Sequence, residues 1–180
     1  MFKKILIGLA VILVILCIVI SLQPSDFRLS RSAAISAPPA TVFAQVNELR
    51  VWEAWSPWAK MDPATKYTYE GPPSGTGSIS RWKSDKLGEG SMTIVESKPA
   101  ESIGIKLEFI KPMTATNDVR FDFKAQGNET FVTWTMTGKN SFLAKAFGLV
   151  FNSEKMLGGQ FDEGLSRLKA VSEASATAVK

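Results

Sequence analysis

Histidine is absent from the 180-residue sequence, and cysteine occurs once, at Cys17. Histidine is the usual general base near neutral pH, so its absence excludes Ser-His and Cys-His nucleophile arrangements. A single cysteine cannot form an internal disulfide. The usual ligand set of a zinc site is also missing, because that set draws on histidine and several cysteines. We therefore expect no metal site of this kind and no cofactor.

An excess of charge of one sign is also missing. The chain has 21 basic and 17 acidic residues, and Lys3 and Lys4 precede the first apolar run, so the remainder is nearly neutral. No dense stripe of lysine and arginine occurs, and a nucleic-acid partner is therefore not expected. With 45% hydrophobic and 21% charged residues, the composition is that of a globular chain. The length fits one domain plus an appendage.

The longest apolar run covers residues 5–22 and contains no charged side chain. As a helix it would measure about 27 Å, close to the roughly 30 Å of a bilayer's hydrocarbon core. A secretory signal has a shorter apolar region with small residues at a cleavage site. No such pattern follows here, and the bulky Leu16 before Cys17 argues against a lipid-attachment signal. We predict that residues 1–25 form an uncleaved transmembrane signal anchor and a short linker, with membrane contact through residues 5–22.

The flanking charges predict the orientation of this anchor. Lys3, Lys4 and the terminal amine favour an N-terminus on the cytoplasmic side. Arg28 and Arg31 on the other side weaken that bias. We expect a single-pass membrane protein whose soluble domain lies outside the cytoplasm, on the periplasmic side if the source is bacterial.

Beyond the linker, the pattern predicts strands and helices of one domain. Residues 27–35 alternate apolar and polar side chains, as a strand does, and Ser36 is placed to cap a following helix. From Lys66 the period-two pattern returns. Glycine- and proline-containing turns separate the predicted strands, which cover residues 79–82, 92–95, 103–110, 119–124 and 130–136. Hairpins with one solvated face show this alternation, so we predict an antiparallel sheet.

One long helix is predicted from residue 141 to about residue 172, roughly 48 Å in length. Apolar side chains recur there at steps of mostly three and four: Leu143, Phe147, Val150, Leu157, Phe161, Leu165, Leu168 and Val171. Gly158, Gly159 and Gly164 interrupt this bulky face, although glycine costs a helix about 1 kcal/mol relative to alanine. Close packing against the sheet and room for a ligand both explain them. The two explanations predict opposite stability changes for Gly158→Ala.

Tryptophan is concentrated in one short stretch. Three of the five tryptophans fall between Trp52 and Trp58. Trp52 and Trp55 lie one turn apart on a predicted short helix, which Pro57 ends. These indoles either seal one end of the core or line the mouth of a cavity, since an indole is apolar with one hydrogen-bond donor.

Three stretches carry a family resemblance: residues 35–43, the Trp-x-x-Trp-Ser-Pro-Trp spacing of 52–58, and 154–169, together with Gly75, Gly77 and Trp82. On these motifs the chain resembles the SRPBCC (START-like) superfamily, in its polyketide cyclase/dehydrase and lipid transport branch. The resemblance implies an α+β helix-grip fold, in which a curved antiparallel sheet wraps around the long C-terminal helix and a deep apolar cavity. It implies no shared catalytic residue set. We place this domain at residues 26–173 and expect a disordered tail at 174–180.

The inward positions of the expected fold are candidates for the cavity lining. These are Trp52, Trp55, Trp82, Met92, Phe109, Phe121, Trp134, Met136, Gly158 and Phe161. A small cavity lined in this way can bury most of an apolar ligand. Together with the absence of obvious catalytic groups, this favours a membrane-anchored module that binds a hydrophobic small molecule or lipid.

Two alternatives stay open. A polyketide cyclase/dehydratase-like enzyme needs an acid or base in the cavity, and the candidates are Glu154, which comes first, Glu96, Tyr67 and Tyr69. The competing interpretation of Glu154 places it at the rim, or in an ion pair with Arg31 or Arg81. The other alternative is a protein-interaction module with a filled core.

We predict that the full-length protein stays with membranes after an alkaline carbonate wash. A segment that spans the bilayer resists this extraction, whereas a domain released by cleavage does not. Mass spectrometry should also detect the peptide that begins at Met1. A soluble mature form that starts after Leu22 would contradict the prediction.

Overall fold

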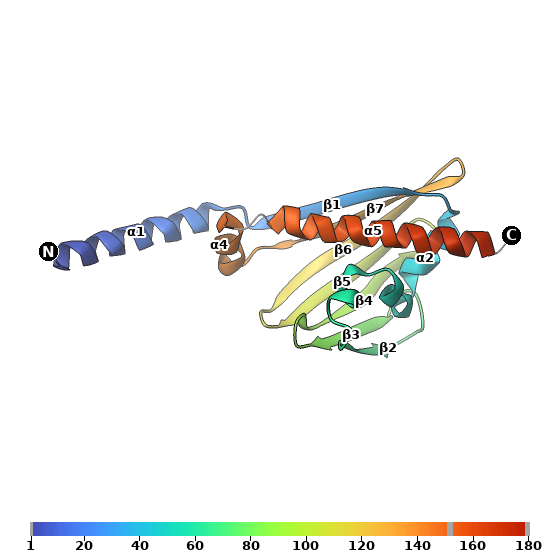
Figure 1. Cartoon of the computed structure of the whole chain (residues 1–180), viewed down its shortest axis with the longest axis horizontal. Helices are drawn as coiled ribbons and strands as arrows, with labels where there is room; N and C mark the ends of the chain where they lie inside the picture. Colours follow the sequence, from blue (N-terminus) through green and yellow to red (C-terminus); the bar gives the residue numbers. More distant parts are fainter. Residues whose placement is uncertain (1, 151–152, 179–180) are drawn as a thin grey trace.

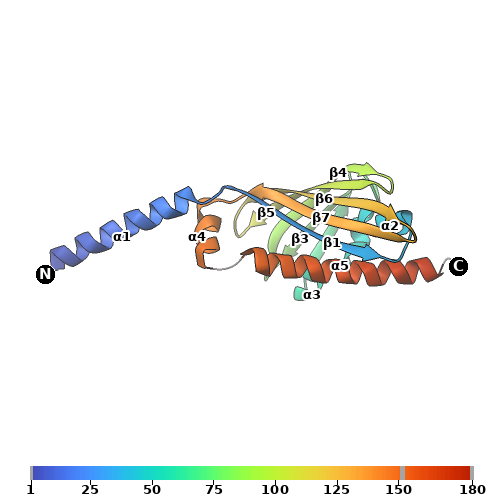
Figure 2. The ribbon, with the colours of Figure 1, turned by 90° about the horizontal axis from the view of Figure 1, so that it is seen from above.

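Seven antiparallel strands form one curved sheet in the computed structural model of the chain, which describes residues 2–150 and 153–178 (Figure 1). The spatial order is β1-β7-β6-β5-β4-β3-β2, so the first and last strands are neighbours and the others follow as hairpins. The strands are β1 (Asp26–Ile35), β2 (Lys66–Glu70), β3 (Ile79–Ser84), β4 (Gly88–Lys98), β5 (Ser102–Lys111), β6 (Ala115–Gln126) and β7 (Glu129–Lys139). The helix α5 (Ser153–Ala178) lies along one face of this sheet (Figure 2). The predicted α+β helix-grip architecture is therefore confirmed.

Period-two alternation accounts for the buried face of the sheet. In β6 the side chains of Phe121 and Phe123 are buried, and antiparallel pairing sets Phe121 opposite Trp134 of β7. Arg120 and Asp122 point to the other face, where the Arg120 Nε lies 2.9 Å from the Asp122 Oδ1. One face of the sheet therefore meets water while the other meets the helices.

Three short helical segments between β1 and β2 cover part of the inner face. They are α2 (Pro39–Asn47), the 3-10 helix η1 (Leu49–Ala54) and α3 (Pro57–Met61). The apolar side chains Val42, Phe43 and Val46 of α2 are buried. The predicted cap is wrong, because Pro38 occupies the N-cap position. Ser36 instead donates its backbone N–H to Glu173 of α5 (2.8 Å) and its hydroxyl to Glu129 of β7 (2.9 Å).

The prediction of one helix from residue 141 to 172 is wrong. The helix α4 (Phe142–Val150) leaves the sheet and lies against the C-terminal end of α1 (Phe2–Leu22), as Figures 1 and 2 show. Helical periodicity predicts an apolar face correctly in both segments, but it does not report what covers that face. The helix α5 continues to Ala178, so residues 174–178, expected in a disordered tail, are helical.

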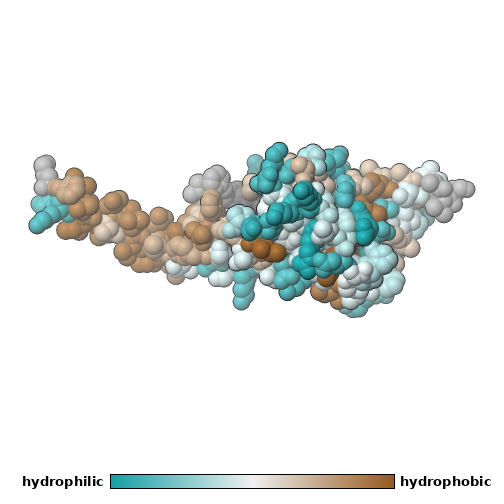
Figure 3. Space-filling model, turned by 90° about the horizontal axis from the view of Figure 1, so that it is seen from below, coloured by the Kyte–Doolittle hydropathy of each residue, from teal (hydrophilic) through white to brown (hydrophobic). Residues whose placement is uncertain are grey.

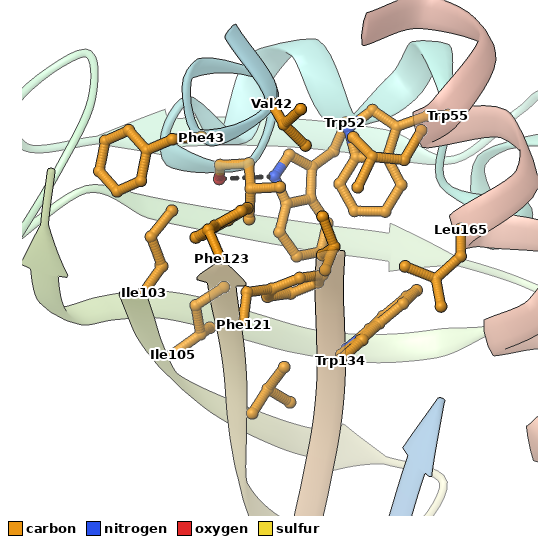
Figure 4. Packing of buried hydrophobic residues seen from close by; sticks show 14 of the residues in the cluster. Val42, Phe43, Trp52, Trp55, Ile103, Ile105, Phe121, Phe123, Trp134 and Leu165 are labelled. Atoms are coloured by element: carbon orange, nitrogen blue, oxygen red, sulfur yellow. Dashed lines mark hydrogen bonds between the residues drawn. The ribbon is translucent and has the colours of Figure 1, made fainter. Parts of the chain in front are cut away.

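An aromatic stack joins α5 to the centre of the sheet. The Phe161 ring of α5 stacks on Trp134 of β7 with a centroid separation of 4.0 Å, and Trp134 stacks on Phe121 of β6 at 4.9 Å. Trp52 and Trp55 meet Phe121 and Trp134 edge-on (Figure 4). Both of these indoles donate to carbonyl oxygens of α2, Trp52 to Val46 (2.9 Å) and Trp55 to Gln45 (3.0 Å). Sheet, α5 and the short helices thus meet at one aromatic cluster.

The glycines of α5 differ in what lies beside them. A Cβ at Gly164 would lie 2.8 Å from Cζ3 of Trp134 and 3.2 Å from Cδ of Pro57. A Cβ at Gly158 would collide with the guanidinium of Arg31, and one at Gly159 would meet no atom within 4 Å. Gly164 therefore permits close packing, the first of the two explanations above, whereas the neighbour of Gly158 is the end of a flexible arginine side chain.

We predict that Gly164→Ala destabilises the protein by about 1–3 kcal/mol, because the added methyl overpacks the contact with Trp134. Gly159→Ala is the matched control in the same helix. It gains the same helix propensity without a clash and should stabilise by up to about 1 kcal/mol. Urea unfolding of the two variants in detergent measures the difference. Equal stabilisation by both alanines would show that α5 is not held against Trp134.

Candidate ligand-binding site

One row of directly paired residues crosses all seven strands on the inner face of the sheet. The strand registers place in this row Tyr69, Ser80, Met92, Leu107, Asn117, Gly138 and Phe27, in order from β2 to β1. Directly paired residues share a face of the sheet. All but Gly138 line a cavity of about 440 Å³. The inner face of the sheet is thus the floor of the cavity. At Gly138 a side chain would collide with Asn117, so glycine keeps this part of the floor flat.

The second row of the floor is aromatic. Antiparallel pairing sets Tyr67 opposite Trp82, Trp82 opposite Gly90, and Gly90 opposite Phe109. The indole of Trp82 lies over Gly90, where any Cβ would collide with it, and meets Phe109 edge-on at 5.7 Å. This glycine therefore allows the large ring to lie along the sheet rather than fill the cavity.

The helices form the opposite wall. Leu157 and Phe161 come from α5, and Trp52, Trp58 and Ala59 come from η1 and α3. Trp58 is half-buried and meets both Trp134 and Phe161 edge-on, at 5.8 and 6.3 Å. The aromatic cluster closes one end of the cavity, and the row from Phe27 to Tyr69 extends beyond it.

The structure places most of the predicted lining residues at this cavity. Those that line it are Trp52, Trp82, Met92, Phe109, Trp134, Met136 and Phe161. Trp55 and Phe121 are fully buried in the core beside it. Gly158 packs against Arg31 instead. The tryptophan stretch therefore does both things considered above, because Trp55 seals the core while Trp52 and Trp58 face the cavity.

Two polar side chains of the floor were not predicted. Ser80 and Asn117 are almost fully buried and line the cavity, and their side chains make no hydrogen bond to another described residue. Alternation could have found both, because Asn117 is two residues before Val119 and Ser80 is two residues before Trp82. They were missed because the predicted strand began only at residue 119, and because a small polar residue is not an obvious lining residue.

The carboxylates considered for catalysis lie elsewhere. Glu96 lies on the outer face, and its ion pairs with Lys98 (2.7 Å) and Arg120 (3.0 Å) hold its pKa below the usual value. The side chain of Glu154 lies outside the described part of the structure. Arg31 lies 3.6 Å from Asp162, and Arg81 lies 2.8 Å from Glu70. Among the described lining residues, Glu53 is the carboxylate at the cavity.

Glu53 belongs to a polar rim at the β2 edge of the cavity, formed with Arg50, Tyr67 and Tyr69. The Tyr69 hydroxyl donates to Oε1 of Glu53 at 2.8 Å, and the Arg50 guanidinium lies 4.4 Å from the centroid of the Tyr69 ring. Burial, followed by the proximity of Glu53, raises the pKa of Tyr67 and of Tyr69. Both phenols therefore stay protonated near neutral pH and offer hydrogen-bond donors rather than bases.

The described residues do not contain a cluster of side chains that could bind a metal ion. Within residues 2–150 and 153–178, no three His, Cys, Asp or Glu side chains gather into a metal-binding group. The site can enclose an apolar body, offer hydrogen bonds at Ser80 and Asn117, and present one carboxylate with two phenols at its rim.

We predict that ionisation of the tyrosines is delayed in the folded protein. The chain has two tyrosines, Tyr67 and Tyr69, so tyrosinate absorbance reports this rim alone. A pKa raised by folding stabilises the protein fully below the unfolded value near 10, and this stabilisation is lost as pH rises through the folded values. Absorbance should therefore rise well above pH 10 in the native protein and at about pH 10 in denaturant. Tyr69→Phe should leave one delayed transition; normal titration in the native state would contradict the rim geometry.

Comparison with known proteins identifies a family. The profile described as "Polyketide cyclase / dehydrase and lipid transport" matches residues 26–173. A comparison with curated proteins found no match.

Several solved structures have the same fold, and their names describe different proteins. CV1439 from Chromobacterium violaceum is 15% identical with a TM-score of 0.58, over 84% of this chain and 99% of that one. The Aha1 dimer from Colwellia psychrerythraea is 14% identical with a TM-score of 0.57, over 82% and 96%. DynU16, a protein in the dynemicin biosynthetic locus, is 13% identical with a TM-score of 0.58, over 83% and 48%. At these identities the similarity shows the fold alone.

Proposed function

The chain belongs to the polyketide cyclase/dehydrase and lipid transport family of the SRPBCC superfamily, and from this premise we propose that it binds a hydrophobic small molecule or lipid while anchored to a membrane. The observation that carries the proposal is the cavity of about 440 Å³ between sheet and helices. Its volume lies within the roughly 300–1,000 Å³ of small-molecule sites, and its wall is mainly aromatic and aliphatic.

The polar groups of the cavity define the chemistry of the proposed ligand. Ser80 and Asn117 have unused hydrogen-bonding capacity on an otherwise apolar floor. The indole Nε1 of Trp134, which also lines the cavity, is buried and has no hydrogen-bond partner among the described residues. A ligand that supplies a hydroxyl or carbonyl at these groups therefore gains more than a pure hydrocarbon. We therefore favour a largely apolar molecule with one or two neutral polar groups.

The membrane anchor is the second half of the proposal. The helix α1 has 21 residues, and an 18-residue window within it has a mean hydropathy of 3.4. Of its side chains only Ile20 is buried. Its length suits a single crossing of a bilayer. Lys3 and Lys4 favour a cytoplasmic N-terminus, which would put the ligand-binding domain outside the cytoplasm.

A cyclase- or dehydratase-like enzyme is the alternative that a specific observation supports. Glu53 lies at the rim and accepts a hydrogen bond from Tyr69, so a carboxylate and a phenol are adjacent at the cavity. Such a pair can exchange a proton with a bound substrate. Glu53→Gln would abolish turnover if this alternative holds and would leave simple binding largely intact. The filled-core interaction module is disfavoured by the cavity itself.

We predict that Met92→Trp abolishes binding of an apolar fluorescent probe to the full-length protein in detergent. Met92 is in the middle of the floor row, and an indole there would occupy space that the ligand needs. Val95→Trp is the matched control, since Val95 belongs to the same strand and is exposed. The control should bind the probe as the native protein does.

Mass spectrometry of an organic extract from the natively purified protein then identifies the ligand. A retained apolar molecule that is lost in Met92→Trp and kept in Val95→Trp supports the proposal. Unchanged probe binding by folded Met92→Trp would show that the ligand lies elsewhere, and the proposal would fall.

A further inference from the structure

The helix α4 carries an apolar face whose large side chains are more than two-fifths exposed. Its sequence is FLAKAFGLV, and Phe142, Leu143, Phe147 and Leu149 are each between 43% and 57% exposed. At about 100° per residue these side chains fall within an arc of roughly 160°, with Lys145 outside it. A helix of this kind is typical of the boundary between headgroups and acyl chains of a bilayer.

Contacts with α1 set the position of α4. The Nζ of Lys145 lies 3.4 Å from the carbonyl oxygen of Ser21, in the last turn of α1. The backbone N–H of Asn140 donates to the Ser25 carbonyl oxygen at 2.6 Å, and Asp26 of β1 pairs with Lys139 of β7. The chain therefore enters α4 beside the point where it leaves α1 (Figure 2).

We propose that α4 lies in the headgroup layer of the bilayer with its apolar face against the acyl chains. The inference rests on the proposed anchoring by α1, because the last turn of a helix that spans the bilayer lies at this depth. A lipid surface is favoured over a protein partner because the exposed apolar surface of α1 continues up to the domain (Figure 3). Arg28, Lys139 and Lys145 lie near the same junction, where they can meet lipid phosphates.

The position of the cavity suggests what the contact between α4 and the bilayer does. Phe27 is the second residue of β1, and Leu157 is the fifth residue of α5. Both line the cavity, so the elements that follow α1 and α4 enter its wall almost at once. When α4 lies in the headgroup layer, the end of the cavity that Phe27 and Leu157 line is held at the membrane surface. The ligand class is then a molecule dissolved in the lipid layer, which enters the cavity without crossing bulk water.

Depth-dependent fluorescence quenching tests the position of α4 in the full-length protein. Cys17→Ser removes the one native cysteine. Leu143→Cys and, independently, Leu149→Cys then carry an environment-sensitive label, in vesicles of phosphatidylcholine and phosphatidylglycerol. Asn128→Cys is the control, in the exposed β6–β7 turn at the far end of the domain (Figure 1). Spin-labelled lipids should quench both α4 labels several-fold more than the control label.

Two other outcomes overturn the inference. A label that is shielded from water but not quenched by lipid would mean that a protein, or a second copy of the chain, covers α4. A label exposed to water would mean that α4 stands clear of the bilayer. Flotation of each sample with its vesicles separates these results from failure of the anchor. Probe binding in the Met92→Trp and Val95→Trp pair reports on the ligand cavity independently.

Discussion

The contact between Phe161 and Trp134 is the interaction on which the rest of the domain depends. The two rings stack at 4.0 Å with planes 15° apart, which brings α5 as close to the sheet as two aromatic side chains allow. Gly164 makes this approach possible, because a side chain there would press on the same indole. Aromatic pairs contribute about 0.5–1.5 kcal/mol beyond the area that they bury. In this cluster Trp134 takes part in five such pairs, with Phe121, Phe161, Trp52, Trp55 and Trp58.

The same contact explains why the domain has a cavity. The rings of the aromatic cluster set the distance between the sheet and the helices that cover it, α5 and the short helices. Towards the row from Phe27 to Tyr69 the sheet offers Met92 and Leu107, which are too small to fill that distance. Trp82 is large enough, but Gly90 lets its ring lie along the strands. Because the cluster fixes this distance and the neighbouring side chains of the sheet do not fill it, a cavity remains beside the cluster.

The elements that follow the proposed anchor give this space two distinct ends. The chain passes from α1 directly into β1, and α4 lies against the end of α1 before α5 begins. An apolar ligand is sparingly soluble in water, so a site close to the bilayer avoids the cost of its hydration. The polar rim of Arg50, Glu53, Tyr67 and Tyr69 belongs instead to the β2 edge, the strand farthest from β1 in the sheet order. The cavity therefore has one end near the proposed bilayer and a polar border across the sheet.

Much of the architecture could be predicted because it follows from repeating patterns. Alternation in residues 119–124 and 130–136 set Phe121, Trp134 and Met136 on the inner face, and the apolar run of 5–22 has the length of a membrane span. The motifs around residues 35–43, 52–58 and 154–169 pointed to the family that the profile shows.

Only the tertiary structure decided which inward residues line the cavity and which pack against one another. Phe121 and Trp134 are paired neighbours with the same orientation, yet one lies wholly in the core and the other borders the cavity. Gly158 was assigned to the cavity and packs on Arg31, and the apolar face of α4 was assigned to the core and is exposed. The physical reason is common to these cases. Periodicity reports the direction of a side chain relative to its own element, whereas burial and cavity lining depend on the partner that crosses that face from a distant part of the chain.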